Sequence, residues 1–176
     1  MVKEIARTVE IPEGVVVSVE GNTVTVKGPK GQLTRQLSYP EIEIKKEDSQ
    51  LIVNSRLNRK QHRAMVGTLA AHVGNMIAGV TRGYEYKMKV VYSHFPIQLK
   101  AASDELLINN FLGERKPRSA RILPGAKVEV GKDEVSITGI DKEQVGQTMA
   151  NIEQATKVRG FDIRIFQDGI YLVEKR

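Results

Sequence analysis

The sequence contains the same succession of segments twice, and this repeat limits the possible folds more than any other feature. Each copy has two strand-like segments, a turn, a further strand-like segment and a helical segment. The separation is nearly constant, at 83 residues between positions 22 and 105 and 84 residues between positions 44 and 128. The matched strand-like segments are 22–26 with 105–109, 42–44 with 128–130, and 51–53 with 135–137. We therefore expect two tandem copies, joined near residues 89–96.

The periodicity of each copy predicts its secondary structure. Apolar residues of the helical segments recur with the 3.6-residue period of a helix and share one face in each copy. These faces consist of Val66, Leu69, Ala70, Val73, Ile77 and Val80 in the first copy, and of Val145, Met149, Ile152 and Ala155 in the second. The strand-like segments alternate with period two and supply a surface on which the helix can pack. We expect an α+β fold with two repeated domains, residues 1–88 and 89–176, each a small mainly antiparallel sheet with one packed helix.

Glycines mark two further features of the first copy. The segment Gly28-Pro29-Lys30-Gly31 is typical of a tight turn between two strands, because Pro fixes one dihedral angle and Gly permits a reversed one. Gly67 and Gly74 lie seven residues apart on the first helical segment. Since Gly weakens a helix relative to Ala, we expect close packing at both positions.

Length and composition exclude several classes of protein. A chain of 176 residues is too short for a large catalytic barrel. It contains no Cys, which excludes disulfides, thiolate metal sites and a cysteine nucleophile. Charges near the start argue against a secretion signal. The longest uncharged run, residues 64–81, is long enough to raise the question of a membrane span, but its His, Asn and Thr residues favour a buried helix. We expect no membrane association.

The sequence shows no pattern of catalytic, metal or cofactor chemistry. The three histidines, His62, His72 and His94, are not at the three- or four-residue helical spacing of a metal site. Residues 125–133 resemble a phosphate-binding loop only superficially, since Ala126 replaces its first Gly and Asp133 replaces the Ser or Thr that contacts magnesium. No Gly-x-Ser-x-Gly segment occurs. We expect no enzyme activity, no cofactor and no small-molecule substrate.

Positive charge is in excess and is concentrated in three short segments. Lys and Arg total 27 against 21 Asp and Glu, which gives a net charge of +6 and a pI near 9.5 and points to a polyanionic partner. The first segment enters the first helix and contains Arg56, Arg59, Lys60 and Arg63. Cations at a helix start oppose the helix dipole, which suggests a compensating phosphate. Simple solvation of these charges is an equal alternative.

The second cationic segment contains Arg115, Lys116, Arg118 and Arg121, with one acid, Glu114. Pro117 stiffens this segment, and a stiff loop loses less conformational entropy when it binds. We predict phosphate contacts here in preference to a solvated hairpin tip.

The third cationic segment contains Lys157, Arg159 and Arg164 and is followed by Lys175 and Arg176 at the end of the chain. The guanidinium fork of Arg can bind two phosphate oxygens at once. Phe161, Phe166 and Tyr171 are interspersed among these cations. Aromatic rings in such a setting can stack on unpaired bases. Because Phe166 and Tyr171 are placed as if alternating along strands, we expect the aromatic residues to belong to the core.

Several blocks of the sequence resemble a known family. They are Tyr92-Ser93-His94-Phe95-Pro96, Asn110-Phe111-Leu112-Gly113-Glu114, Gln154-Ala155-Thr156-Lys157-Val158 and the run from Arg164 through Gln167-Asp168-Gly169 to Leu172 and Lys175. They resemble the universal large-subunit ribosomal protein L-six family in its archaeal and eukaryotic branch. The tandem repeat is similar to the two-domain layout of that family. Phe161 departs from the signature, which has a basic residue there.

This resemblance implies a function. A member of the family is a structural constituent of the large ribosomal subunit in the cytoplasm and supports translation. It binds large-subunit rRNA near the sarcin-ricin loop and the translation-factor site, has neighbouring large-subunit ribosomal proteins as partners, and uses its second domain as the main rRNA anchor. The alternatives are a two-domain protein-protein adaptor outside the ribosome, which would bind independently of salt, and an RNA-processing enzyme without recognisable motifs.

Overall fold

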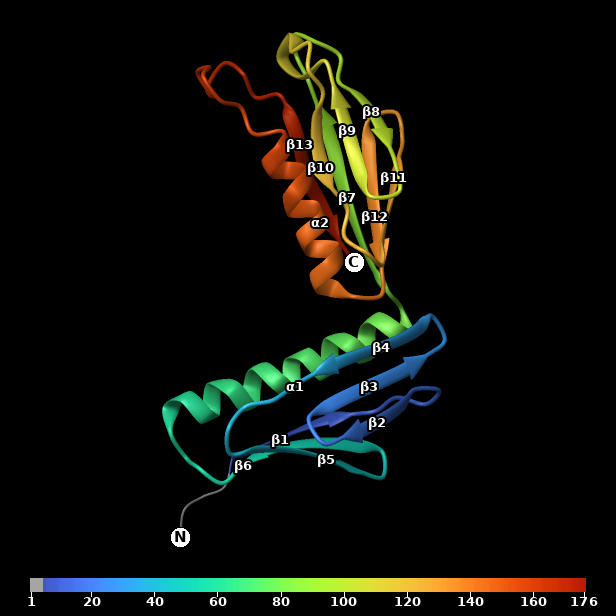
Figure 1. The fold of residues 1–176 in the computed structure, drawn as a ribbon, viewed down its shortest axis with the longest axis vertical. Coiled ribbons are helices and arrows are strands. Elements are labelled where there is room, and N and C mark those ends of the chain that lie inside the picture. The colour runs from blue at the N-terminus through green and yellow to red at the C-terminus, as the bar shows by residue number, and fades with distance from the viewer. Residues whose placement is uncertain (1–4) are drawn as a thin grey trace. The chain divides into compact units, whose positions relative to one another are not determined.

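The computed structural model describes residues 5–176 and divides the chain into two compact units, residues 1–83 and 84–176. The division lies five residues before the boundary expected after residue 88. The reason is strand β7 (Tyr84–Val91), which pairs on both sides within the second unit and therefore belongs entirely to it. Both units have the α+β architecture that the repeat predicts, and each contains one long helix (Figure 1).

The first unit consists of two three-stranded antiparallel sheets and a helix. One sheet has the order β1-β6-β5 and the other the order β2-β3-β4. Helix α1 (Lys60–Thr81) packs across strands of both sheets. The strands are β1 (Ile5–Glu10), β2 (Val16–Glu20), β3 (Thr23–Gly28), β4 (Gly31–Gln36), β5 (Ile42–Glu47) and β6 (Gln50–Ser55). The predicted turn at residues 28–31 joins β3 to β4, with Gly28 paired to Gly31.

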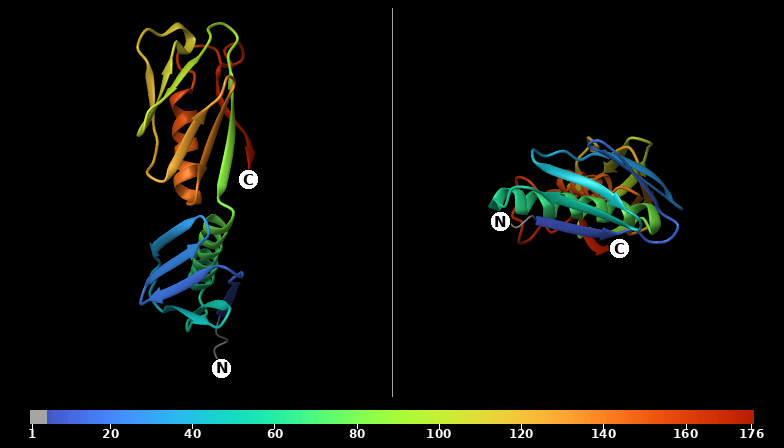
Figure 2. Two further views of the ribbon diagram at one scale, coloured as in Figure 1. Left: turned by 90° about the vertical axis from the view of Figure 1, so that its right-hand side faces the viewer. Right: turned by 90° about the horizontal axis from the view of Figure 1, so that it is seen from below.

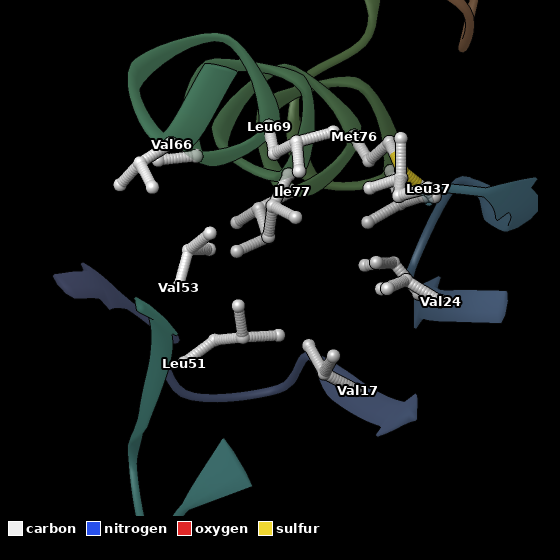
Figure 3. Packing of buried hydrophobic residues seen from close by; sticks show 13 residues of the cluster. Val17, Val24, Leu37, Leu51, Val53, Val66, Leu69, Met76 and Ile77 are labelled. Carbon is white, nitrogen blue, oxygen red and sulfur yellow. The ribbon is translucent and has the colours of Figure 1, made fainter. Parts of the chain in front are cut away.

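The core of the first unit lies between α1 and the two sheets. Figure 3 shows Leu69 and Ile77 of α1 directed toward Leu51 and Val53 of β6. All six residues of the predicted helix face are buried. By length and composition α1 could cross a membrane, with a mean hydropathy of 1.3 over its most apolar window. Its apolar face is instead covered by the sheets, as expected of a buried helix.

The second unit repeats this plan with an additional strand. A three-stranded sheet has the order β10-β9-β8, and a four-stranded sheet has the order β11-β12-β7-β13. Strand β13 pairs with the free side of β7, antiparallel like every other pair in the unit. The other elements are β8 (Gln98–Ala101), β9 (Glu105–Asn109), the short 3-10 helix η1 (Phe111–Gly113), β10 (Arg118–Arg121), β11 (Ala126–Val130), β12 (Glu134–Gly139), α2 (Lys142–Ala155) and β13 (Gly169–Lys175).

The helical glycines differ from expectation. A Cβ atom added at Gly67 would lie 3.8 Å from Arg7 Cζ, which is an ordinary contact distance, and one added at Gly74 would meet nothing within 4 Å. Close packing therefore does not explain these two residues. The tight approach occurs at Gly28, where an added Cβ would lie 2.7 Å from Val80 Cγ2 and 2.8 Å from the Val80 carbonyl oxygen. The turn after β3 is thus packed against the end of α1.

Candidate nucleic-acid interface

The end of helix α2 is the anchor of the third cationic segment. Asp141 begins the helix by accepting a hydrogen bond from the Glu143 N–H at 2.9 Å. At the other end, the buried Thr156 hydroxyl accepts the Ile170 N–H at 3.1 Å and can donate to the Ile152 carbonyl at 3.2 Å. The loop of residues 157–168, called here the C-terminal loop, is therefore fixed at its two ends by one side chain.

A second loop, residues 110–117, precedes strand β10 and carries Arg115 and Lys116. It is called here the η1 loop. It turns sharply because Asn110 and Leu112 both adopt left-handed backbone conformations, with φ of 58° and 49°. Such a conformation costs roughly 1 kcal/mol for a residue like Leu. Burial of Phe111 and of Leu112 itself offsets that cost. In Figures 1 and 2 this loop and the C-terminal loop lie at the same end of the second unit, where α2 ends.

Arg118 connects these two loops. Its Nε donates to Glu114 Oε2 at 2.8 Å and its Nη2 to Glu114 Oε1 at 2.5 Å. Its Nη1 donates to the carbonyl oxygens of Ala155 and Lys157, both at 2.9 Å. The guanidinium also lies 4.3 Å from the centroid of the Phe111 ring. One side chain thus joins the η1 loop to the last carbonyls of α2 and the start of the C-terminal loop.

Arg118 itself is engaged within the unit. Four of its five N–H donors are used there, and its side chain is only 20% exposed. Hydrogen bonds from Arg118, together with its charge, hold the pKa of Glu114 below the ordinary value of 4.5. Arg118 therefore has one N–H donor left for a phosphate, and its hydrogen bonds hold the two loops together. Sequence reasoning cannot separate Arg118 from the other three cations of this segment, because its carbonyl acceptors at Ala155 and Lys157 are 37 and 39 residues away along the chain.

The remaining cations of the two segments point to solvent. Within residues 5–176, the side chains of five of them form no ion pair or hydrogen bond, and all five are exposed: Arg115, Lys116, Arg121, Lys157 and Arg159. Arg164 is 90% exposed and its Nε lies 3.8 Å from Asp162 Oδ1. An exposed pair at that distance contributes little. These six cations leave their charge available to an external anion.

The aromatic residues contradict the expectation that they belong to the core. Phe161 is 50% exposed and Tyr171 is 43% exposed, while Phe166 is half-buried. Residues 161–168 form turns and loop rather than a strand, so the period-two reasoning does not apply to Phe166. The Phe166 ring packs near the rings of both His94 and Phe161, with centroid distances of 4.9 and 4.8 Å.

Asp168 is a structural residue that the sequence reasoning did not single out. Its side chain is fully buried, and its Oδ2 accepts the Ser93 N–H at 3.3 Å. Its Oδ1 lies 3.9 Å from Nδ1 of His94 and forms no hydrogen bond with the described residues. Asp168 therefore ties the end of the C-terminal loop to the residues that follow β7. The only sequence signal was its place in the Gln-Asp-Gly block of the family signature.

The first cationic segment lies in the first unit and is partly engaged. Arg56 Nη2 donates to Glu43 Oε1 at 2.8 Å, and Arg63 Nε donates to Asn58 Oδ1 at 2.9 Å. The hydrogen bond from Lys45, and then the charge of Arg56, lower the pKa of Glu43.

At the start of the helix, Arg59 occupies the N-cap position of α1 without a capping side-chain hydrogen bond, and the first turn contains no acid. The cations Arg59 and Lys60 thus stand beside uncapped helix N–H groups, as the sequence predicts.

Comparison with known sequences identifies the family. The sequence model of the family described as ribosomal protein L6 matches residues 11–83 and 95–169, one stretch in each unit. The chain belongs to the ribosomal protein L6 family. The matched stretches are the two copies of the internal repeat, so the repeat is a property of the family, and the resemblance noted in the sequence is confirmed.

Archaeal members of the L6 family are similar to this chain over its whole length. A protein of Methanothrix thermoacetophila is 66% identical over 176 residues and covers all of both chains. One from Methanosarcina mazei is 55% identical over 175 residues and 99% of each chain, and one from Methanobrevibacter smithii is 53% identical over 171 residues, 97% of this chain and 96% of its own. Each is named large ribosomal subunit protein uL6. Membership of this family confirms a structural ribosomal component of the cytoplasm rather than an enzyme.

Proposed function

We propose that this L6-family chain binds large-subunit rRNA mainly through the second unit, with the η1 loop, the C-terminal loop and Arg121 at the end of β10 as the contact surface. The observation that carries the proposal is the set of hydrogen bonds from Arg118 to Glu114, Ala155 and Lys157, called here the Arg118 clasp. It holds two cationic loops at one end of the unit. Arg115, Lys116, Arg121, Lys157, Arg159 and Arg164 would then contact phosphates, and neighbouring ribosomal proteins would cover other faces.

The physical basis is neutralisation of closely spaced phosphates. Six exposed cations, five on the two stiff loops and Arg121 on β10, can bind RNA phosphates and release condensed counterions. Because the loops are fixed by Arg118, Thr156 and Asp168, little conformational entropy is lost on binding. Contacts of this kind fix the orientation of the protein on the RNA without reading its sequence.

The location of this contact in the subunit follows from the family resemblance. We place it near the sarcin-ricin loop and the translation-factor site, so that translation factors would bind close to the second unit. The first cationic segment would contribute less, because Arg56 and Arg63 already have partners within the first unit. Arg59 and Lys60, beside the uncapped start of α1, are the members of that segment for which a phosphate contact is still expected.

The salt dependence of rRNA binding tests this proposal. With about six phosphates neutralised, the slope of log K against log salt should be about −4 to −5. Replacing Arg159 and Arg164 by Ala should weaken binding and reduce the size of the slope by about 1.5 to 2. The measurement is filter binding or fluorescence anisotropy with a large-subunit rRNA transcript between low and physiological salt.

A matched control removes equal charge elsewhere in the same unit. Lys127 and Lys132 are exposed cations of the β11–β12 hairpin, and neither lies on the proposed contact surface. Their double replacement by Ala should leave the slope nearly unchanged. Equal effects of the two double variants would contradict the proposed surface, and binding that does not depend on salt would favour the alternative of a protein-protein adaptor.

A further inference from the structure

Between helix α2, the C-terminal loop and β13 the second unit has a hollow of about 370 Å³. It lies within the size range of small-ligand sites. Its apolar lining consists of Val158, Ile163, Phe166 and Tyr171, and the polar residues Gln154 and Gln167 also line it. An apolar slot with a few polar groups is suited to a flat aromatic ligand that also has hydrogen-bonding edges.

A second hollow of about 390 Å³ adjoins the first, because Gln154 lines both. Its lining includes Arg118, Ser119 and Arg159 and is cationic. The charge of Arg118 is balanced by Glu114, but the exposed Arg159 side chain has no ion-pair partner within residues 5–176. The first hollow, called here the slot, therefore adjoins a cationic hollow that can bind an anion.

We propose that the apolar hollow receives one unpaired nucleobase of the bound RNA, while its phosphate lies in the adjoining hollow beside Arg159. This inference rests on the proposed rRNA binding and specifies what one part of the surface recognises. Ile163 and the Phe166 or Tyr171 ring contact the faces of the base, and the amides of Gln154 and Gln167 pair with its edge.

The arrangement of charge favours a nucleotide over an apolar side chain of a neighbouring protein. Lys157 lies on the lining of the slot, Arg159 lines the adjoining hollow, and Arg164 follows Ile163 directly in the loop. The one acid of the lining, Glu153, can accept a hydrogen bond from an exocyclic amine of a base. The hydroxyl of Tyr171 donates a hydrogen bond to the Gln167 carbonyl at 3.1 Å, which fixes the Tyr171 ring beside the slot.

Two neighbouring isoleucines provide a matched pair of variants. Ile163 is 69% exposed and lines the slot, whereas Ile165 is 64% exposed, lies in the same turn and does not line it. Neither belongs to the buried core, so replacement by Ser should leave the fold intact. Thermal unfolding of both variants checks this.

The probe is an RNA hairpin with one bulged adenosine, compared with the same hairpin in which that nucleotide is abasic. The two RNAs carry the same phosphates and differ only in the base. The full chain should bind the adenosine hairpin about 5- to 10-fold more tightly, as one stacked base would give. Ile163→Ser should remove most of this preference and leave binding of the abasic hairpin unchanged, while Ile165→Ser should leave both affinities unchanged.

The outcomes separate the inference from the proposed function. Equal affinity for the two hairpins, or equal effects of the two Ser variants, would overturn the nucleobase slot while salt-dependent binding persisted. Binding without salt dependence would overturn the proposed function and the slot with it. In purified large subunits, a photoreactive benzophenone side chain at position 163 should crosslink to rRNA, and crosslinks to protein alone would overturn the inference in favour of a protein side chain as the occupant.

Discussion

At the scale of single residues, Arg118 has a different role from its neighbours in the sequence. Its planar guanidinium binds the Glu114 carboxylate through two nitrogens and reaches two backbone carbonyls near the end of α2. A lysine at this position would keep the charge but could not reproduce the fork. Glu114 is thereby paired with Arg118, and the neighbouring Arg115 and Lys116 are exposed.

Replacing Arg118 by Lys should therefore destabilise the second unit. Loss of the fork and of the carbonyl contacts should lower the free energy of unfolding by about 2 kcal/mol, since hydrogen bonds to charged groups contribute about 1.5 to 3 kcal/mol each. Urea unfolding provides the measurement. Arg121→Lys, at an exposed side chain, is the control and should change stability by less than about 0.5 kcal/mol. A similar change in the free energy of unfolding for both variants would show that the hydrogen bonds of Arg118 do not stabilise the unit.

The pair of Glu114 and Arg118 should also make stability depend on pH. Because the pKa of Glu114 is lowered in the folded chain, its ionised form stabilises the fold above about pH 4.5, and this contribution is lost as pH falls through the lowered pKa. Unfolding free energies between pH 7 and pH 3 should therefore fall more steeply in the unchanged protein than in Glu114→Gln. If the unfolding free energies of the two proteins fell in parallel with pH, the lowered pKa of Glu114 in the folded chain would be contradicted.

At the scale of elements, the turn between β3 and β4 is fitted to the end of α1. The Lys30 N–H donates to the Val80 carbonyl at 2.9 Å, and the Lys30 ammonium donates to the carbonyl of Arg82. Gly28 lies against Val80 at a distance that excludes a side chain. The helix is thus held at its C-terminal end by backbone and side-chain contacts from a hairpin tip.

Substitution of Gly28 by Ala should disrupt this contact, while the same substitution at Gly74 should be tolerated. An added methyl group at Gly28 meets a backbone oxygen and should destabilise the fold by about 1 to 3 kcal/mol. At Gly74 the space is open, and Ala should stabilise α1 by up to about 1 kcal/mol. Thermal or urea unfolding of the two variants measures both. Shifts of the same sign would contradict this description of the packing.

The sequence predicts both helices and the buried face of α1 well, because burial of one side of a helix imposes a 3.6-residue period that can be read directly. Val66, Val73 and Val80 are fully buried as expected. The period-two reasoning fails for Phe166, since residues 161–168 form turns and loop, where neither the helical nor the strand period applies. The clasp at Arg118 could not be predicted either, because its acceptors come from a part of the chain that only the tertiary fold brings close.

At the scale of the whole molecule, the two units share one plan but differ in what they offer to RNA. The second unit has an extra strand, β13, and the C-terminal loop between α2 and that strand carries three of the six exposed cations and part of the lining of the slot. After α1 the chain passes almost directly into β7, and the first unit presents Arg59 and Lys60 at the start of α1. We therefore expect duplication of the fold without duplication of the main RNA contact.

The most direct test of the central claim is ultraviolet crosslinking of the unaltered chain within purified large ribosomal subunits, followed by mass spectrometry of peptide-nucleotide adducts. We predict that the adducts concentrate in peptides that contain residues 115–121 and 157–166. Adducts confined to the first unit or to the β11–β12 hairpin, with none in these two segments, would contradict the account.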